Sequence, residues 1–209
     1  FFAFFTLIVF ANIIVWGTIY IATIVLIVRR FAKTVFGREG YLTNTLPVSA
    51  HQLILSKLLV AFILDIISSL VILLSIGIIA AFCLDMKDIL LATSYFGQIL
   101  KEIGAFYLFI PSTILSIIAG ILFYYLCISI GNLFNNNKVL MGFVAYFAIQ
   151  AILFFIGFFF GLGAALTGDA TNTAINNSSY IFSLVQSLIL IAASYFGTYY
   201  IMTKRLNLN

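Results

Sequence analysis

Five long apolar runs dominate this chain and limit the folds that it can adopt. They cover residues 1–28, 53–84, 103–133, 139–166 and 180–203. Each run exceeds the roughly 20 residues that a helix needs to cross a hydrocarbon core about 30 Å thick. Strands of a membrane barrel would instead alternate in polarity over only about ten residues. We therefore expect an all-α, polytopic membrane helix bundle that forms a single transmembrane domain over residues 1–209.

The distribution of positive charge predicts the orientation of these runs in the lipid bilayer. Charged residues make up 8% of the chain and hydrophobic residues 64%, which is typical of membrane proteins and not of soluble domains. Eight of the ten cations fall on one side of the five-span pattern, namely Arg29, Arg30, Lys33, Arg38, Lys57, Lys138, Lys204 and Arg205. Because cytoplasmic loops are rich in Lys and Arg, we expect this side and the C-terminus to face the cytoplasm. Five spans then place Phe1 outside, and we expect a sixth helix upstream of it.

A polar, cationic segment over residues 29–52 separates the first two apolar runs. Pro47 cannot lie inside a helix and disfavours helical geometry at the residue before it, so the chain must break there. Ser49 and Gln52 have the capping-box spacing that begins the next helix. Two glycines earlier in the segment permit a sharp change of direction and leave a short surface helix or turn. Since both ends of the segment continue into spanning helices, we expect it to dock a soluble partner and to receive force from it.

Four short motifs, three of them in or just after this segment and one at the end of the chain, are typical of one protein family. Residues 38–42 read REGYL, residues 45–49 read TLPVS, residues 52–57 read QLILSK, and the chain ends in KRLNLN. In these motifs the chain resembles the permease subunits of bacterial ATP-binding-cassette exporters of the ABC-2 type. The resemblance implies six helices per subunit and two subunits, as a homodimer or a heterodimer, in the bacterial cell membrane. It also implies a cytosolic ATPase docked beneath each subunit.

The same resemblance implies roles for particular segments. Residues 29–52 would hold the cytoplasmic coupling helix, and the first apolar run would be the second helix of the family. The residues that couple to the ATPase would be Arg38, Glu39, Gly40, Tyr41, Leu42 and Pro47. The first and fourth apolar runs would line the translocation path.

Two pairs of side chains are our candidates for that path. Asn12 and Trp16 share one face of the first run, and Gln150 and Phe154 share one face of the fourth. Each pair places an aromatic ring one turn after an amide, so that it can hold an amphipathic cargo by one hydrogen bond and one apolar contact. The alternative role for these four residues is packing within the bundle.

The sequence has no motif with which it could hydrolyse ATP itself. It lacks the GxxxxGK[ST] phosphate loop, the HExxH and GxSxG motifs, and any Cys/His cluster with metal-ligand spacing. We therefore expect a permease subunit without enzymatic activity or cofactor, whose partner ATPase binds ATP and Mg²⁺. The net charge of +4 reflects topology and does not indicate nucleic-acid binding, because no basic patch is interleaved with exposed aromatics. The single histidine, His51, is expected at a helix start or on the surface.

Asp65 is the acidic residue that lies well inside a span, and its role separates the alternative functions. An unpaired carboxylate at that depth is costly. Helical spacing places it on a small or polar stripe made of Lys57, Ala61, Asp65, Ser68, Ser69 and Ser75. The stripe is either a packing surface or part of an ion or substrate site. An ion-coupled secondary transporter that uses Asp65, or a membrane-embedded enzyme, is thus the alternative to a permease, although paired repeats and broken helices are not evident.

Overall fold

The protein is an all-α bundle, as predicted. The computed structural model describes residues 2–36, 49–83, 87, 90–91, 93–95, 97, 106–134, 137–166 and 173–204. Its helices are α1 (Phe2–Val35), α3 (Ala50–Cys83), α5 (Phe106–Gly131), α6 (Lys138–Leu166) and α7 (Thr173–Lys204). Each of these five contains a stretch that is long and apolar enough to cross a membrane. Their order and approximate bounds match the five predicted spans.

The first helix is longer than its apolar run, which corrects the predicted start of the polar segment. Hydropathy predicts that start at Arg29, but α1 continues to Val35. Ile27, Phe31 and Val35 recur every four residues and are all buried. Arg29 lies on the exposed part of the same turns. The helix therefore continues because its apolar stripe packs on the bundle, while the cations lie on the exposed side of the helix.

The start of α3 confirms the predicted capping box. The main-chain N–H of Ser49 donates to Oε1 of Gln52 over 3.2 Å, and the N–H of Gln52 donates to Oγ of Ser49 over 3.4 Å. These reciprocal bonds satisfy two amides that a helix start would otherwise leave without partners. The predicted coupling residues, Arg38 to Leu42 and Pro47, lie outside the described residues.

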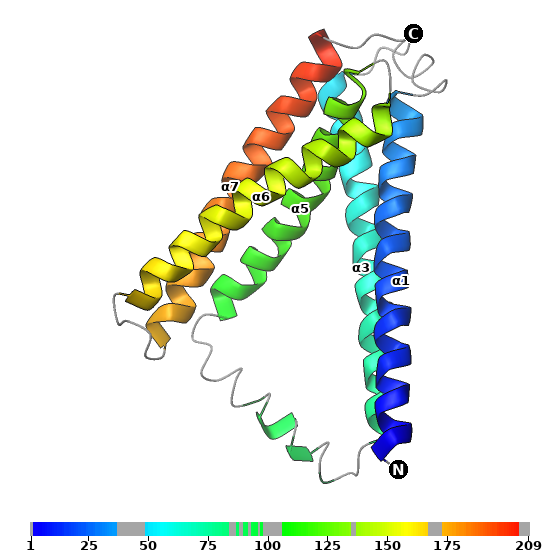
Figure 1. The fold of residues 1–209 in the computed structure, drawn as a ribbon, viewed down its shortest axis with the longest axis vertical. Coiled ribbons are helices and arrows are strands. Elements are labelled where there is room, and N and C mark those ends of the chain that lie inside the picture. The colour runs from blue at the N-terminus through cyan, green and yellow to red at the C-terminus, as the bar shows by residue number, and fades with distance from the viewer. Residues whose placement is uncertain are drawn as a thin grey trace.

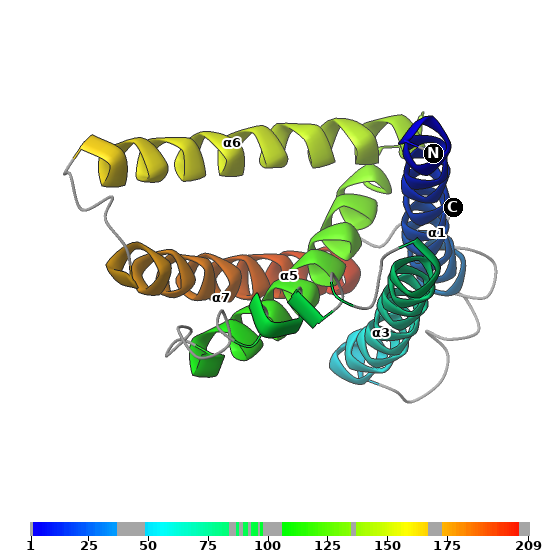
Figure 2. The same cartoon turned by 90° about the horizontal axis from the view of Figure 1, so that it is seen from below.

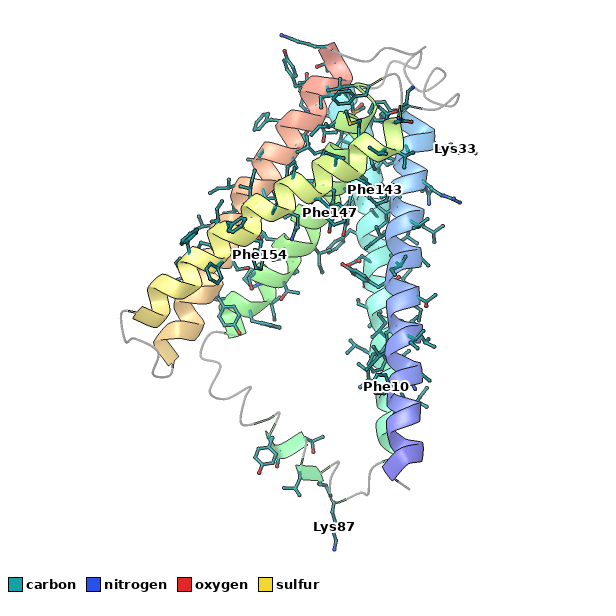
Figure 3. The ribbon with its side chains drawn as sticks, in the orientation of Figure 1. Phe10, Lys33, Lys87, Phe143, Phe147 and Phe154 are labelled. Carbon is teal, nitrogen blue, oxygen red and sulfur yellow. The ribbon has the colours of Figure 1, made fainter. Side chains whose placement is uncertain are left out.

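The five helices form two groups that meet at one end and diverge toward the other (Figure 1). One group is the pair α1 and α3, and the other contains α5, α6 and α7. Helix α5 joins the groups, since it contacts each of the other four. The C-terminal ends of α1, α5 and α7 and the N-terminal ends of α3 and α6 all lie where the groups meet (Figure 1). Lys33 lies at this end (Figure 3), where α6 also begins at Lys138 and α7 ends at Lys204, so we call the meeting point the cationic end. Lys87 lies at the opposite end (Figure 3).

The core of the bundle lies at the cationic end and is centred on Tyr125 of α5. Its ring stacks on Phe31 of α1 with ring centroids 3.9 Å apart. Its hydroxyl donates a hydrogen bond of 3.0 Å to the main-chain carbonyl of Lys57 in α3. A phenol buried in this way needs such an acceptor. One side chain thus ties three helices together.

Small polar residues let α5 and α7 pack closely along their length. Ser116 and Ser187 share a hydrogen bond of 3.2 Å across the contact. Ser194 and Thr198 are fully buried, and their hydroxyls have no hydrogen-bond partner among the described residues. Small side chains of this kind bring backbones close together in membrane helix pairs.

Helix α6 stands apart from the other helices over most of its length. It joins α5 through a tight turn, in which a Cβ added at Gly131 would lie 2.5 Å from the carbonyl oxygen of Lys138. Asn137 adopts a φ of 60° in the same turn. Beyond the turn, α6 and α7 run antiparallel while α5 crosses obliquely (Figure 2). Phe143 and Phe147 project from α6 and are exposed (Figure 3).

Candidate functional site

The candidate site is a groove that α5, α6 and α7 form together, with a volume of about 410 Å³. We refer to it as the α5–α6–α7 groove. Its polar lining consists of Ser116, Tyr124, Tyr146, Gln150, Ser183, Gln186 and Ser187. Its remaining lining is small or apolar and includes Gly120, Phe123 and Phe154. A cavity of this size and mixed character is suitable for a small ligand that has an apolar body and polar groups.

Two amides from different helices line this groove. Gln150 comes from α6 and Gln186 from α7. Neither side-chain amide has a hydrogen-bond partner within the described part of the chain. A polar group without a partner is costly at membrane depth, so a solute or water in the groove would satisfy both amides.

One aromatic pair lines the groove, and a second pair lies further along α6 and α7. At the cationic end, Tyr124 of α5 and Tyr146 of α6 stack with ring centroids 6.0 Å apart. Further from that end, Phe160 of α6 stacks on Phe182 of α7 with ring centroids 3.9 Å apart. Tyr146 and Phe160 are 14 residues apart, which is about 21 Å along a helix. The two pairs therefore bracket most of the membrane thickness.

Tyr124 of the pair at the cationic end also interacts with side chains of α1 and α3. Tyr124 interacts electrostatically with Tyr20 of α1, Tyr146 of α6 and Asp65 of α3. Asp65 is partly buried. These interactions involve one acidic and three phenolic side chains from four helices, which we call the Asp65 cluster.

The structure brings only one of the two predicted path pairs to the groove. Gln150 and Phe154 are among its lining residues, and both are exposed. Asn12 and Trp16 lie on α1 away from it, and Trp16 Nε1 donates a hydrogen bond of 3.1 Å to Ser75 Oγ on α3. Trp16 thus packs against α3 within the bundle, which was the alternative role that we gave for Asn12 and Trp16.

The predicted polar stripe on α3 is partly confirmed as a packing surface. Ser75 accepts the bond from Trp16, and Ser68 shares a hydrogen bond of 2.7 Å with Thr23 of α1. Ser69, in contrast, is exposed and donates to the carbonyl of Ile66 in its own helix. The stripe is therefore narrower than helical spacing suggested.

His51 lies at the start of α3, as expected, but it also connects α3 to α7. Its Nδ1 shares a hydrogen bond of 2.6 Å with the hydroxyl of Tyr195. Its ring stacks on Tyr199 with centroids 4.2 Å apart and planes 16° from parallel. We call these three residues the His51 latch. Sequence reasoning missed it, because 144 residues separate His51 from Tyr195.

The described side chains contain no group of three or more His, Cys, Asp or Glu residues that could hold a metal ion. Comparison of the chain with protein families, with curated proteins and with solved structures found no match. The groove, the Asp65 cluster and the His51 latch are thus the features from which a function can be argued.

Proposed function

We propose that this chain is the membrane-spanning permease subunit of an ATP-driven exporter in the bacterial cell membrane, with its C-terminus in the cytoplasm. It forms a homodimer or heterodimer with a second permease subunit and couples to separate cytosolic ATPases. The observation that carries the proposal is the α5–α6–α7 groove, a partly polar space within a bundle of five apolar helices. The motifs of residues 38–57, which resemble those of ABC-2 permeases, support it independently.

The groove has the properties that a cargo site in such a permease needs. The amides of Gln150 and Gln186 supply hydrogen bonds, while Phe123 and Phe154 supply apolar surface. The pairs Tyr124–Tyr146 and Phe160–Phe182 can separate in turn, so that the cargo meets one side of the membrane at a time. Such alternation requires two conformations of the permease, and ATP binding must stabilise one of them more than the other.

Contacts at the cationic end can transmit a movement of the ATPase to the helices that line the groove. In our proposal the ATPase contacts residues 38–47, which lie outside the described residues and connect α1 to α3. A shift of α1 reaches α5 through the stack of Phe31 on Tyr125. A shift of α3 reaches α7 through the bond between His51 and Tyr195. Both helices of the moving pair thus contact helices that line the groove.

Cargo-stimulated ATP hydrolysis in liposomes tests this proposal. The chain is co-expressed with its ATPase, and Gln150→Leu and Gln186→Leu are compared with Phe155→Leu, which alters an exposed aromatic beside the groove. Loss of one hydrogen bond to the cargo should raise the half-maximal cargo concentration about three- to tenfold while basal hydrolysis persists. If both Gln variants lose basal hydrolysis and stability together, with no selective change in cargo response, the amides are structural and the path lies elsewhere.

An ion-coupled secondary transporter is the second candidate, and Asp65 is the observation that favours it. Asp65 is a partly buried carboxylate on a helix that is long and apolar enough to cross a membrane. A transporter of that class would work without an ATPase and would need an ion gradient. Transport that stops when the gradient is dissipated but continues without ATP would favour this candidate over the permease.

A further inference from the structure

A cleft between α1 and α3 at the cationic end is separate from the α5–α6–α7 groove. The two helices lie side by side and antiparallel (Figure 1), and Tyr125 of α5 completes the lining of the cleft. The lining contains two cations, Arg30 of α1 and Lys57 of α3, together with apolar and aromatic side chains. The cleft and the groove share no lining residue. We call this space the α1–α3 cleft.

The two cations of the cleft lie at the same depth. Arg30 is five residues before the end of α1 at Val35, and Lys57 is seven residues after the start of α3 at Ala50. These separations are about 8 and 11 Å along the helix axes. Because the two helix ends lie together, both cations are at one level. Among the described residues, no carboxylate lines the cleft beside them.

That level is where the phosphates of a lipid bilayer begin. Helices α1 and α3 each have 34 residues, a length of about 51 Å, against a hydrocarbon core of about 30 Å. An equal overhang is about 10 Å at each end, which places both cations at the boundary of the core. Neighbouring like charges repel each other most where water is scarce, so an anion bound between them would stabilise both.

The rest of the lining distinguishes a lipid from a soluble anion. Ile27 precedes Arg30 by three residues, while Val60 and Leu64 follow Lys57 by three and seven. Because the helices are antiparallel, all three apolar side chains lie on the membrane-centre side of the cations. Val60 and Leu64 are partly exposed and offer apolar surface to an acyl chain. The enclosed volume is only about 10 Å³, room for about one water molecule, so the anion would bind at the mouth of the cleft.

We propose that the mouth of the α1–α3 cleft binds the phosphate of an anionic membrane lipid, with Arg30 and Lys57 on the phosphate and an acyl chain along Val60 and Leu64. Basic pockets between transmembrane helices bind anionic head groups in this way. The planar guanidinium of Arg can hold two phosphate oxygens at once, while Lys acts as a point charge. The lipid bridges α1 and α3 next to the bond from Tyr125 to the main chain of Lys57, and it stabilises the junction of three helices there.

Lipid binding by the full chain in mild detergent tests the inference, since native mass spectrometry resolves each bound lipid. Phosphatidylglycerol is the anionic probe, and phosphatidylcholine with the same acyl chains is the zwitterionic probe. Arg30→Gln and Lys57→Gln each remove one charge from the cleft. The matched control is Arg29→Gln, which removes a charge from an exposed neighbour that does not line the cleft. Thermal unfolding shows that each variant is folded.

A basic side chain near a membrane surface strengthens binding of an anionic lipid about fivefold. The wild-type chain should bind its first phosphatidylglycerol about tenfold more tightly than phosphatidylcholine, and loss of either cleft cation should reduce this preference to about twofold. Arg29→Gln and the charge-conserving Lys57→Arg should keep most of the preference. A wild-type chain without a preference, or an equal fall in Arg29→Gln, would overturn the inference.

Glycerol 3-phosphate separates a lipid site from a general anion site, because it carries a phosphate without acyl chains. At the concentration of the lipid it should leave phosphatidylglycerol bound. Displacement of the lipid at that concentration would contradict a lipid ligand. The measurement requires neither ATP nor cargo, so its result is independent of the proposed export function.

Discussion

Breaking the His51 latch should separate α3 from α7 at the cationic end. His51→Ala removes a hydrogen bond of 2.6 Å to Tyr195 and the stack on Tyr199 at 4.2 Å. A hydrogen bond contributes about 0.5–1.5 kcal/mol net, and an aromatic pair a similar amount. Because His51 is exposed, solvent competes for both contacts, and we expect a loss of about 1–2 kcal/mol, the lower part of that sum. For a chain of this length that corresponds to a fall in Tm of about 2–8 °C.

A double-mutant cycle isolates the bond within the latch. Tyr195→Phe removes the hydroxyl and keeps the ring, so it should cost less than His51→Ala. In the cycle the two changes should show a coupling energy of about 0.5–1.5 kcal/mol, because residues in direct contact are not additive. Thermal unfolding in detergent measures all three variants, and Leu55→Ala, an exposed position one turn further along α3, is the matched control.

The latch should also matter for the transmission of force. If it couples α3 to α7, His51→Ala should leave cargo binding intact while fewer cargo molecules move per ATP hydrolysed. Additive effects in the cycle, or a His51→Ala variant as stable and as well coupled as Leu55→Ala, would refute this account of the latch.

Three further predictions concern the turn, the topology and the coupling segment. Gly131→Ala places a Cβ against main-chain atoms of the α5–α6 turn and should cost about 1–3 kcal/mol in thermal unfolding; Gly157→Ala has open space and should be nearly neutral, and equal costs would contradict the turn geometry. Single cysteines at Lys204 and Thr93, in a chain without its two native cysteines, should label from opposite sides of the membrane with an impermeant thiol reagent, and labelling from one side would refute the five-span topology. Glu39→Ala should leave insertion intact but weaken retention of the ATPase on affinity resin, and unchanged retention and transport would make residues 38–47 a simple connector.

The architecture could be predicted because membrane spans depend on length and composition alone. Each of the five apolar runs became a helix at the expected place. The capping box at Ser49 could also be predicted, because its bonds join residues three apart. The continuation of α1 past Arg29 was missed, since hydropathy falls there while the buried face of Phe31 and Val35 continues.

The site was harder to predict because it depends on which helices are neighbours. Helical spacing placed Gln150 and Phe154 on one face, and that face lines the groove. The same argument applied equally to Trp16, which contacts Ser75 in the α1–α3 pair instead. The sequence around Gln186 on α7 does not mark it as a groove residue, because its place in the groove depends on α6 lying on the other side. A single sequence reveals the periodicity of each helix, but it does not reveal which neighbouring helix each face contacts.

The identity of the chains that co-purify with this protein tests the central proposal most directly. The tagged chain is extracted in mild detergent with its native partners, and native mass spectrometry measures the intact complex. We predict two permease subunits together with ATPase subunits that carry a phosphate-binding loop, and hydrolysis of ATP by that complex. A chain that purifies without any ATPase, and that transports cargo in liposomes with only an ion gradient, would contradict the exporter account.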